Sequence, residues 1–174
     1  ITGESDMDTE IKFKIHRRGK FANGKSFGEV GPYEYIAGQV EFAVDPMSTA
    51  YQMIVDLNHA PRSTKNMVEF TTDFYIIRPV DLEKGNRRLL YDVNNRGSMR
   101  ALQFFNDALH SNTPTTLEHA GNGFLMRRGY SLVWSGWQGD ILDTEGRMTM
   151  KLPIATKNSS NITGITRSEL IVDN

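Results

Sequence analysis

The 174-residue chain contains no cysteine. The absence of thiols excludes disulfides, thiolate nucleophiles, cysteine-ligated zinc and iron–sulfur clusters. It does not fix the redox compartment, because a chain without thiols folds equally well in reducing and oxidising surroundings. The sequence also lacks any run of about 20 apolar residues, the length that a membrane-spanning helix requires. We therefore expect a soluble chain with no membrane span.

An excess of charge of either sign is missing as well. The 20 Lys and Arg residues nearly balance the 21 Asp and Glu residues, which gives a formal net charge of −1 at pH 7. The basic residues are dispersed along the chain, with isolated pairs such as Arg17-Arg18 and Arg127-Arg128. Nucleic acids are bound by concentrated basic surfaces, so we expect no nucleic-acid partner.

Several motifs that carry enzymatic chemistry are absent. The sequence has no G-x-S-x-G nucleophile elbow, no G-x-x-x-x-G-K-[ST] phosphate loop and no G-x-G-x-x-G after a predicted strand. Its four histidines are scattered, and none has a second histidine four residues away, as a helical zinc site requires. We therefore expect no metal and no cofactor, and no catalytic triad can be assigned within the chain.

Alternating apolar residues are the strongest pattern in the first half of the chain. Ile11, Phe13 and Ile15 alternate with polar residues, which predicts a strand with one buried face and with His16 pointing to solvent. The alternation changes phase at Gly38, which predicts a β-bulge or a bend there. Strands are predicted at 33–44, 51–57, 68–76, 89–93, 130–134, 148–152 and, less regularly, 165–172.

The middle of the chain predicts an α/β unit. A helical pattern follows 89–93, with Ser98 as its expected N-cap, and a short helix ends at Gly129. The apolar run 130–134 is typical of a strand buried on both faces, so we expect it to lie parallel to 89–93. The predicted fold class is α/β, with a β-rich mixed sheet and few helices. An α+β or β-sandwich-like domain is the alternative.

Two polar turns follow these two strands, and ligands of open α/β sheets bind at the carboxyl ends of parallel strands. Backbone N–H groups at a strand-to-helix turn can stabilise an oxyanion. The first turn offers oxyanion-loop candidates: Asn95, Arg96 and Gly97. The second turn offers substrate-binding candidates: Trp137, Gln138 and Asp140. In the alternative interpretation these residues are only structural, and Arg96 pairs with Asp92.

The same turns carry a family resemblance. Residues 31–172 resemble the N-terminal part of the bacterial "alpha/beta hydrolase domain-containing protein" family, whose members are mostly uncharacterised. Asn95-Arg96-Gly97 and Trp137-Gln138-Gly139-Asp140 are the specific motifs. Supporting segments are Gly31-Pro32-Tyr33-Glu34, Val44-Asp45-Pro46, Ile54-Val55-Asp56-Leu57, Leu89-Leu90-Tyr91-Asp92-Val93, Arg128-Gly129-Tyr130 and Ile162-Thr163-Gly164.

The resemblance implies an α/β-hydrolase-like sheet, an ester-like small-molecule substrate and a serine nucleophile downstream of these motifs. We therefore expect residues 1–174 to form a single domain, with a flexible tail at 1–10, that is a fragment of a longer hydrolase-like protein. The chain starts at Ile1, so we expect that a leader or upstream segment was removed, which favours a secreted or periplasmic location.

Two functions are expected from these observations. The first is the N-terminal scaffold portion of a serine ester hydrolase, which lacks the nucleophile elbow and is inactive alone. The alternative is a non-catalytic, β-rich binding or assembly module. In either case an open edge of the sheet favours self-association.

Overall fold

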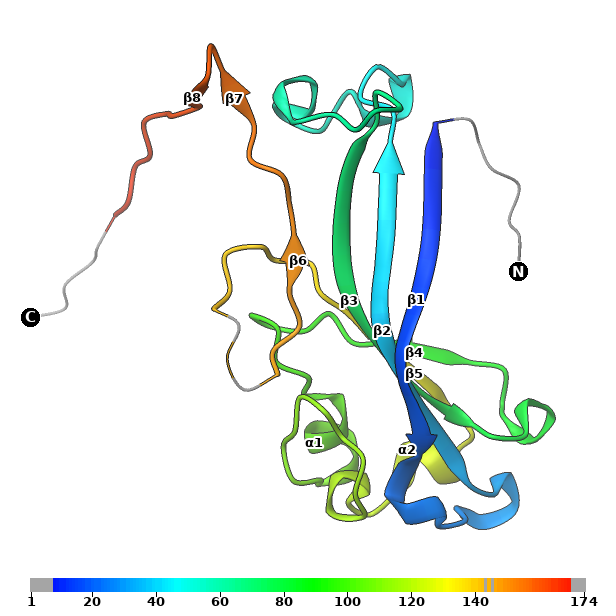
Figure 1. Cartoon of the computed structure of the whole chain (residues 1–174). Coiled ribbons are helices and arrows are strands. Elements are labelled where there is room, and N and C mark those ends of the chain that lie inside the picture. Colours follow the sequence, from blue (N-terminus) through cyan, green and yellow to red (C-terminus); the bar gives the residue numbers. More distant parts are fainter. Residues whose placement is uncertain (1–7, 143, 145, 170–174) are drawn as a thin grey trace, which may run out of the picture.

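A mixed β-sheet organises the computed structural model, which describes residues 8–142, 144 and 146–169 (Figure 1). Its strands are β1 (Thr9–Lys20), β2 (Tyr33–Val44), β3 (Val68–Pro79), β4 (Leu89–Tyr91), β5 (Ser131–Ser135) and β6 (Met150–Lys151). The strand order is β1-β2-β3-β5-β4, with β6 paired to β3. The pair β4–β5 is parallel, as predicted, and the other pairs of this sheet are antiparallel.

Helices are few and short. They are α1 (Ala101–Asn106), α2 (Phe124–Arg127) and the 3-10 turns η1 (Phe21–Gly24), η2 (Gly28–Val30), η3 (Thr49–Tyr51), η4 (Leu57–His59), η5 (Leu82–Lys84) and η6 (Glu118–Ala120). The prediction of a sheet-rich mixed fold with few helices is therefore confirmed. Among the described residues, no helix is long and apolar enough to cross a lipid bilayer.

β2 has no bulge at Gly38; its apolar alternation changes phase there because Tyr33 and Ala37 pack on one face of the sheet and Val40 packs on the other. The bulge lies opposite Gly38, in β1. Ile15 pairs with Gly38 and Arg17 pairs with Ala37, so His16 is an extra residue in β1 while β2 runs on without interruption. The two backbones approach closely here, because a Cβ atom on residue 38 would lie 1.9 Å from the carbonyl oxygen of Lys14. Glycine is therefore the residue that lets β2 pass the bulge.

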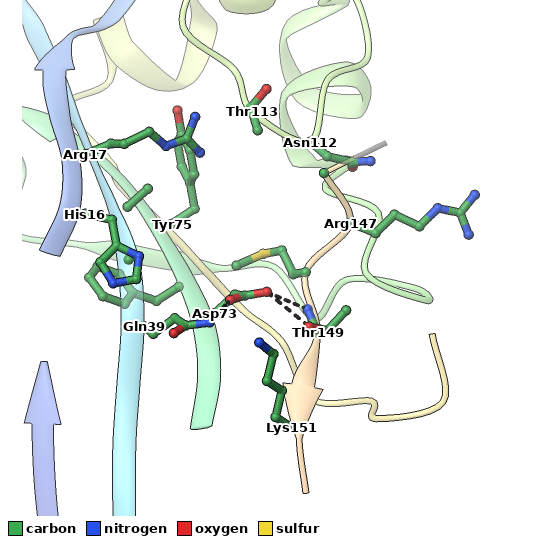
Figure 2. Close-up of a pocket in the computed structure, with 15 residues that line it drawn as sticks. His16, Arg17, Gln39, Asp73, Tyr75, Asn112, Thr113, Arg147, Thr149 and Lys151 are labelled. Atoms are coloured by element: carbon green, nitrogen blue, oxygen red, sulfur yellow. Dashed lines mark hydrogen bonds between the residues drawn. The ribbon is translucent and has the colours of Figure 1, made fainter. Parts of the chain in front are cut away.

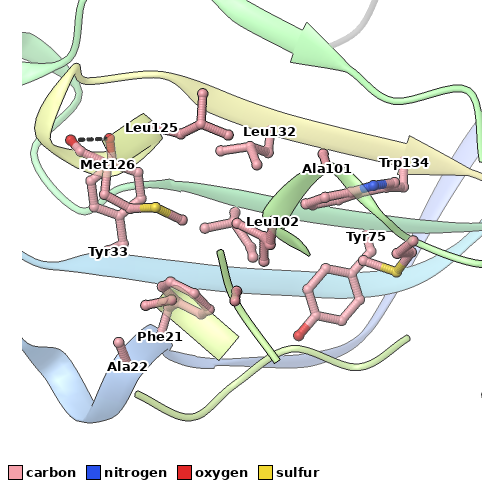
Figure 3. Close-up of a cluster of buried hydrophobic side chains, with 14 of the residues drawn as sticks. Phe21, Ala22, Tyr33, Tyr75, Ala101, Leu102, Leu125, Met126, Leu132 and Trp134 are labelled. Carbon is pink, nitrogen blue, oxygen red and sulfur yellow. Dashed lines mark hydrogen bonds between the residues drawn. The ribbon is translucent and has the colours of Figure 1, made fainter. Parts of the chain in front are cut away.

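The main core lies between one face of the sheet and the helices (Figure 3). Tyr33 and Trp134 are completely buried and project from the sheet toward Leu102 of α1 and Met126 of α2. The Tyr33 hydroxyl donates hydrogen bonds to the carbonyl oxygens of Met126, at 3.0 Å, and Tyr130, at 3.1 Å. Burial of this hydroxyl raises the pKa of Tyr33. This buried hydroxyl is therefore paired within the core.

The opposite face of the sheet is apolar but is not covered by α1 or α2. The register places Ile11 beside Phe42 and Phe13 beside Val40 on this face. Ile11, Phe13 and Ile15 are 58%, 61% and 57% exposed. The cluster at its centre consists of sheet side chains: Ile36, Val40 and Phe74, with Phe42 and Ile76 against them. The prediction that β1 buries its apolar side chains is therefore wrong, because the described residues place no helix over them.

One carboxylate on this second face is nearly buried. Glu34 accepts hydrogen bonds from Arg18 Nε at 2.7 Å and from Arg78 Nε at 2.9 Å. Burial of the carboxyl group raises its pKa, but the two guanidinium groups together outweigh burial, so the pKa of Glu34 is lowered. Glu34 therefore stays ionised and joins β1, β2 and β3 on this face.

Several local predictions are corrected by the structure. Residues 51–57 form turns next to η3 and η4 rather than a strand, and Asp56 has a left-handed φ of 60° that interrupts extended backbone. Thr9 and Glu10 belong to β1 rather than to the expected tail, whose residues 1–7 lie outside the described part.

At the C-terminal end, the expected strand 165–172 is not formed over 165–169, and its last residues lie outside the described part. The Asn/Ser-rich stretch before it contains a two-stranded hairpin of β7 (Thr156–Lys157) and β8 (Ser160–Asn161). Asn158 and Ser159 form its turn, both with positive φ, as a tight hairpin turn requires. Figure 1 shows this hairpin projecting away from the main sheet.

Candidate functional site

The two predicted turns meet at the carboxyl ends of β4 and β5. Because β4 and β5 are parallel and Tyr91 pairs with Val133, both turns leave the sheet at the same edge. The indole Nε1 of Trp137 donates to the carbonyl oxygen of Asn94 at 2.6 Å, and the Asn94 amide donates to the carbonyl oxygen of Ser135 at 2.6 Å. The two turns are therefore bound directly to each other.

Arg96 makes the polar link between the turns. Its backbone N–H donates to Gln138 Oε1 at 2.9 Å. Its guanidinium group donates to Asp140 Oδ2 at 3.1 Å and to the Asp140 carbonyl oxygen at 3.3 Å. Both side chains of this ion pair are at least half exposed, so the pair contributes about 1 kcal/mol or less to stability. Its role is to fix the orientation of the turn.

Gly97 holds the turn against a neighbouring segment. Its φ is +74°, and a Cβ atom there would lie 2.5 Å from the carbonyl oxygen of Met148. The Gly97 N–H donates to Asn94 Oδ1 at 3.1 Å, while the Gly97 carbonyl accepts the Met148 N–H at 3.0 Å. Only glycine combines this conformation with this close approach.

The turn thus carries two N–H donors of the kind that an oxyanion site uses, and both have acceptors within the protein. Asn94, which accepts from Gly97, is almost fully buried. Gln138, which accepts from Arg96, is only partly buried. A bound oxyanion would therefore replace Gln138 Oε1 more easily than Asn94 Oδ1. The side chain of Asn95 is exposed, and its carbonyl oxygen accepts the Ser98 N–H at 3.1 Å.

Asp92 has a structural role that differs from the expected one. Its Oδ2 accepts the N–H groups of Arg100, at 3.1 Å, and Ala101, at 2.9 Å, which begin α1. The same oxygen accepts the indole N–H of Trp134 at 2.6 Å. The pairing of Asp92 with Arg96 and the N-cap at Ser98 are both wrong, because the carboxylate at the end of β4 already caps the helix.

Ser98 instead contacts a histidine that sequence reasoning did not connect to it. Ser98 Oγ lies 2.9 Å from His110 Nε2, a nucleophile–base arrangement that the sequence conceals because α1 lies between the two residues. In the described part of the chain no carboxylate is bonded to His110, so the pair lacks the third group that orients a catalytic histidine.

Metal chemistry has no counterpart in the part of the chain that the structure describes, where no group of three His, Asp or Glu side chains could hold an ion. His119 is structural, because its Nδ1 accepts the backbone N–H groups of Thr115, at 3.1 Å, and Thr116, at 3.2 Å. Burial lowers the pKa of His119, which keeps the ring neutral for these bonds.

The comparison with known proteins places this site in no family. No protein-family model, no curated protein and no solved structure matches the chain.

Proposed function

We propose that the chain is the scaffold portion of a serine-type ester hydrolase, with the substrate carbonyl bound at the carboxyl ends of β4 and β5. The observation that carries the proposal is the direct bonding of turn 94–97 to turn 137–140 at these two strand ends. Open α/β sheets bind their ligands at this position. The nucleophile is supplied by residues outside those described.

In this proposal each motif has a defined task. The backbone N–H of Arg96 donates to the oxyanion that forms as the ester carbonyl is attacked, and Gln138 Oε1 occupies that place in the free protein. Asp140 holds the guanidinium of Arg96 and so sets the angle of the N–H. Trp137, which is 47% exposed, offers an apolar surface to the acyl or alcohol part of the ester.

The test is the replacement of Arg96 by alanine in the native protein from its source, whose intact mass is measured first. We expect ester turnover to fall about tenfold or more, because the freed turn no longer holds its N–H at the reacting oxygen. The melting temperature should change little, because an exposed ion pair is lost. Turnover is followed with a chromogenic ester.

Arg87→Ala is the matched control. Arg87 also has positive φ and pairs with an exposed carboxylate, Glu83 at 2.9 Å, but it lies before β4 rather than after it. Equal turnover in the two variants would remove Arg96 from the site. A native mass equal to that of the 174-residue chain, together with no ester turnover, would reject the hydrolase proposal as a whole.

A second function is favoured by the uncovered face of the sheet. We propose an assembly module in which a second copy of this chain covers Ile11, Phe13 and Ile15. Exposed apolar patches larger than about 400 Å² usually mark interaction sites. Pairing of two β1 edges is disfavoured, because β1 carries five Lys and Arg side chains and one acidic side chain, Glu10. Face-to-face contact avoids this repulsion.

The replacement of Phe13 by aspartate tests the assembly module. We expect the wild-type chain to elute at twice the mass of one chain in light scattering and the variant to elute as a monomer, because a charge on this face would be buried without a partner. Lys12→Asp, on the opposite face of the same strand, should leave the dimer intact. A monomeric wild-type chain at all concentrations contradicts the proposal, and circular dichroism checks that each variant is folded.

A further inference from the structure

A pocket with lining residues other than the strand-end candidates opens on the helical side of β1, β2 and β3 (Figure 2). Its volume is about 250 Å³, and segment 146–151 closes it on the side opposite β1. His16 and Arg17 line it from β1, Asp73 from β3 and Lys151 from β6. These residues are far apart in the sequence, so the pocket depends on the tertiary fold.

The bulge in β1 builds one wall of this pocket. In a regular strand, residues two apart share a face, so Arg17 would lie on the apolar face with Ile15. The extra residue His16 moves Arg17 to the opposite face, where it pairs with Ala37, and both His16 and Arg17 line the pocket. Bulges commonly redirect side chains next to binding sites. Gly38, opposite the bulge, is required for this arrangement.

Asp73 is the carboxylate among the described residues of the pocket wall, and neutral groups bind it. Asp73 Oδ1 accepts from Gln39 Nε2 at 3.0 Å, and Oδ2 accepts from the Thr149 N–H at 2.9 Å and from the Thr149 hydroxyl at 3.3 Å. Figure 2 shows these bonds at the floor of the pocket. Asp73 is therefore held in the wall as part of the link between β3 and segment 146–151.

Arg17 and Lys151 bring two positive charges to the pocket, and Asp73 brings one negative charge. Among the described residues, neither Arg17 nor Lys151 forms an ion pair. Figure 2 shows the Arg17 guanidinium beside Tyr75 at the pocket wall. Burial raises the pKa of the Tyr75 hydroxyl, and the charge of Arg17 acts on it in the opposite direction, which agrees with this position.

We infer that this pocket binds a small oxyanion, a phosphate or carboxylate group carried by a small molecule, with Arg17 as its main contact. The guanidinium fork of Arg17 suits two oxygens of one group, and Lys151 adds positive charge at the other end of the pocket. Thr113 lines the pocket from the loop that follows α1. The volume suits a small molecule rather than a polymer. This inference does not rest on the hydrolase proposal.

The test is a calorimetric titration of the 174-residue chain with inorganic phosphate and, separately, with acetate and citrate. We expect saturable binding of at least one anion with a Kd of about 1 mM or tighter, which weakens as sodium chloride is added. The phosphate and carboxylate arms distinguish the two sources of the oxyanion. A chain that binds none of the three anions overturns the inference.

Variants distinguish anion binding in this pocket from a general electrostatic attraction of anions to the basic strand β1. The double variant Arg17→Gln, Lys151→Gln should lose at least about tenfold in affinity, while Lys12→Gln, a matched loss of charge on β1 outside the pocket, should bind as the wild type does. Arg17→Lys keeps the charge but not the fork and should bind with intermediate affinity. Equal weakening by Lys12→Gln, or full binding by a folded double variant, contradicts the site.

Discussion

Replacing Gly38 by alanine is expected to lower the free energy of unfolding by about 3 kcal/mol, a large part of the stability of a domain this size. The added Cβ would lie 1.9 Å from the carbonyl oxygen of Lys14, and the clash is with backbone rather than with a side chain that can rotate away. Relief requires β1 and β2 to separate where the bulge joins them. Urea denaturation followed by circular dichroism measures the loss.

Gly164→Ala is the control for this experiment, because no atom lies within 4 Å of a Cβ placed there. We expect it to change the free energy of unfolding by less than about 0.5 kcal/mol. If Gly38→Ala were as mild as this control, the close pairing of β1 with β2 at the bulge would be wrong. The anion pocket should also be lost in Gly38→Ala, because Arg17 reaches the pocket through the same bulge.

Replacing Asp92 by alanine is expected to lower the free energy of unfolding by about 2–3 kcal/mol. Three N–H groups share its Oδ2, and the indole N–H of Trp134 belongs to a side chain that is completely buried. Without the carboxylate, this donor has no acceptor and α1 loses its cap. Near-ultraviolet circular dichroism of the tryptophan should change together with the urea midpoint.

Two further variants define the cause of this loss. Asp92→Asn keeps one side-chain oxygen and should lower the free energy of unfolding by less than Asp92→Ala does. Asp81→Ala removes a carboxylate that caps the exposed turn η5 through the Glu83 N–H alone, and we expect a loss of about 1 kcal/mol or less. A loss in Asp92→Ala as small as that in Asp81→Ala would show that the bond to Trp134 adds little.

The residue pattern predicted those strands of the sheet whose apolar side chains recur at regular spacing or form a continuous run. Alternation located β1, β2 and β3, and an apolar run located β5 beside its parallel partner β4. Alternation shows which side chains share a face, but it does not show whether another element covers that face, so the exposure of Ile11, Phe13 and Ile15 was not predicted. The stretch 51–57 is apolar without regular alternation, and its left-handed Asp56 follows from tertiary context.

For the candidate site, the sequence predicted which turns meet but not which side chains bind each other. Parallel strands explain why Arg96 and Trp137 come together, because their turns leave the same edge of the sheet. The partners themselves depend on loop geometry, so Arg96 binds Asp140 rather than Asp92. The anion pocket was missed because the bulge at His16 changes the face of Arg17, and the residue pattern of β1 does not mark this bulge.

The strands of the main sheet differ greatly in length, so we expect them to open locally at different free energies. β1, β2 and β3 each run for 12 residues, whereas β4 has 3 residues and forms the edge of the sheet beside β5. Short edge strands with exposed side chains are released at a lower free energy than central strands. The turn that carries Arg96 is therefore attached to the part of the sheet that opens most readily, and motion there requires no disturbance of the three long strands.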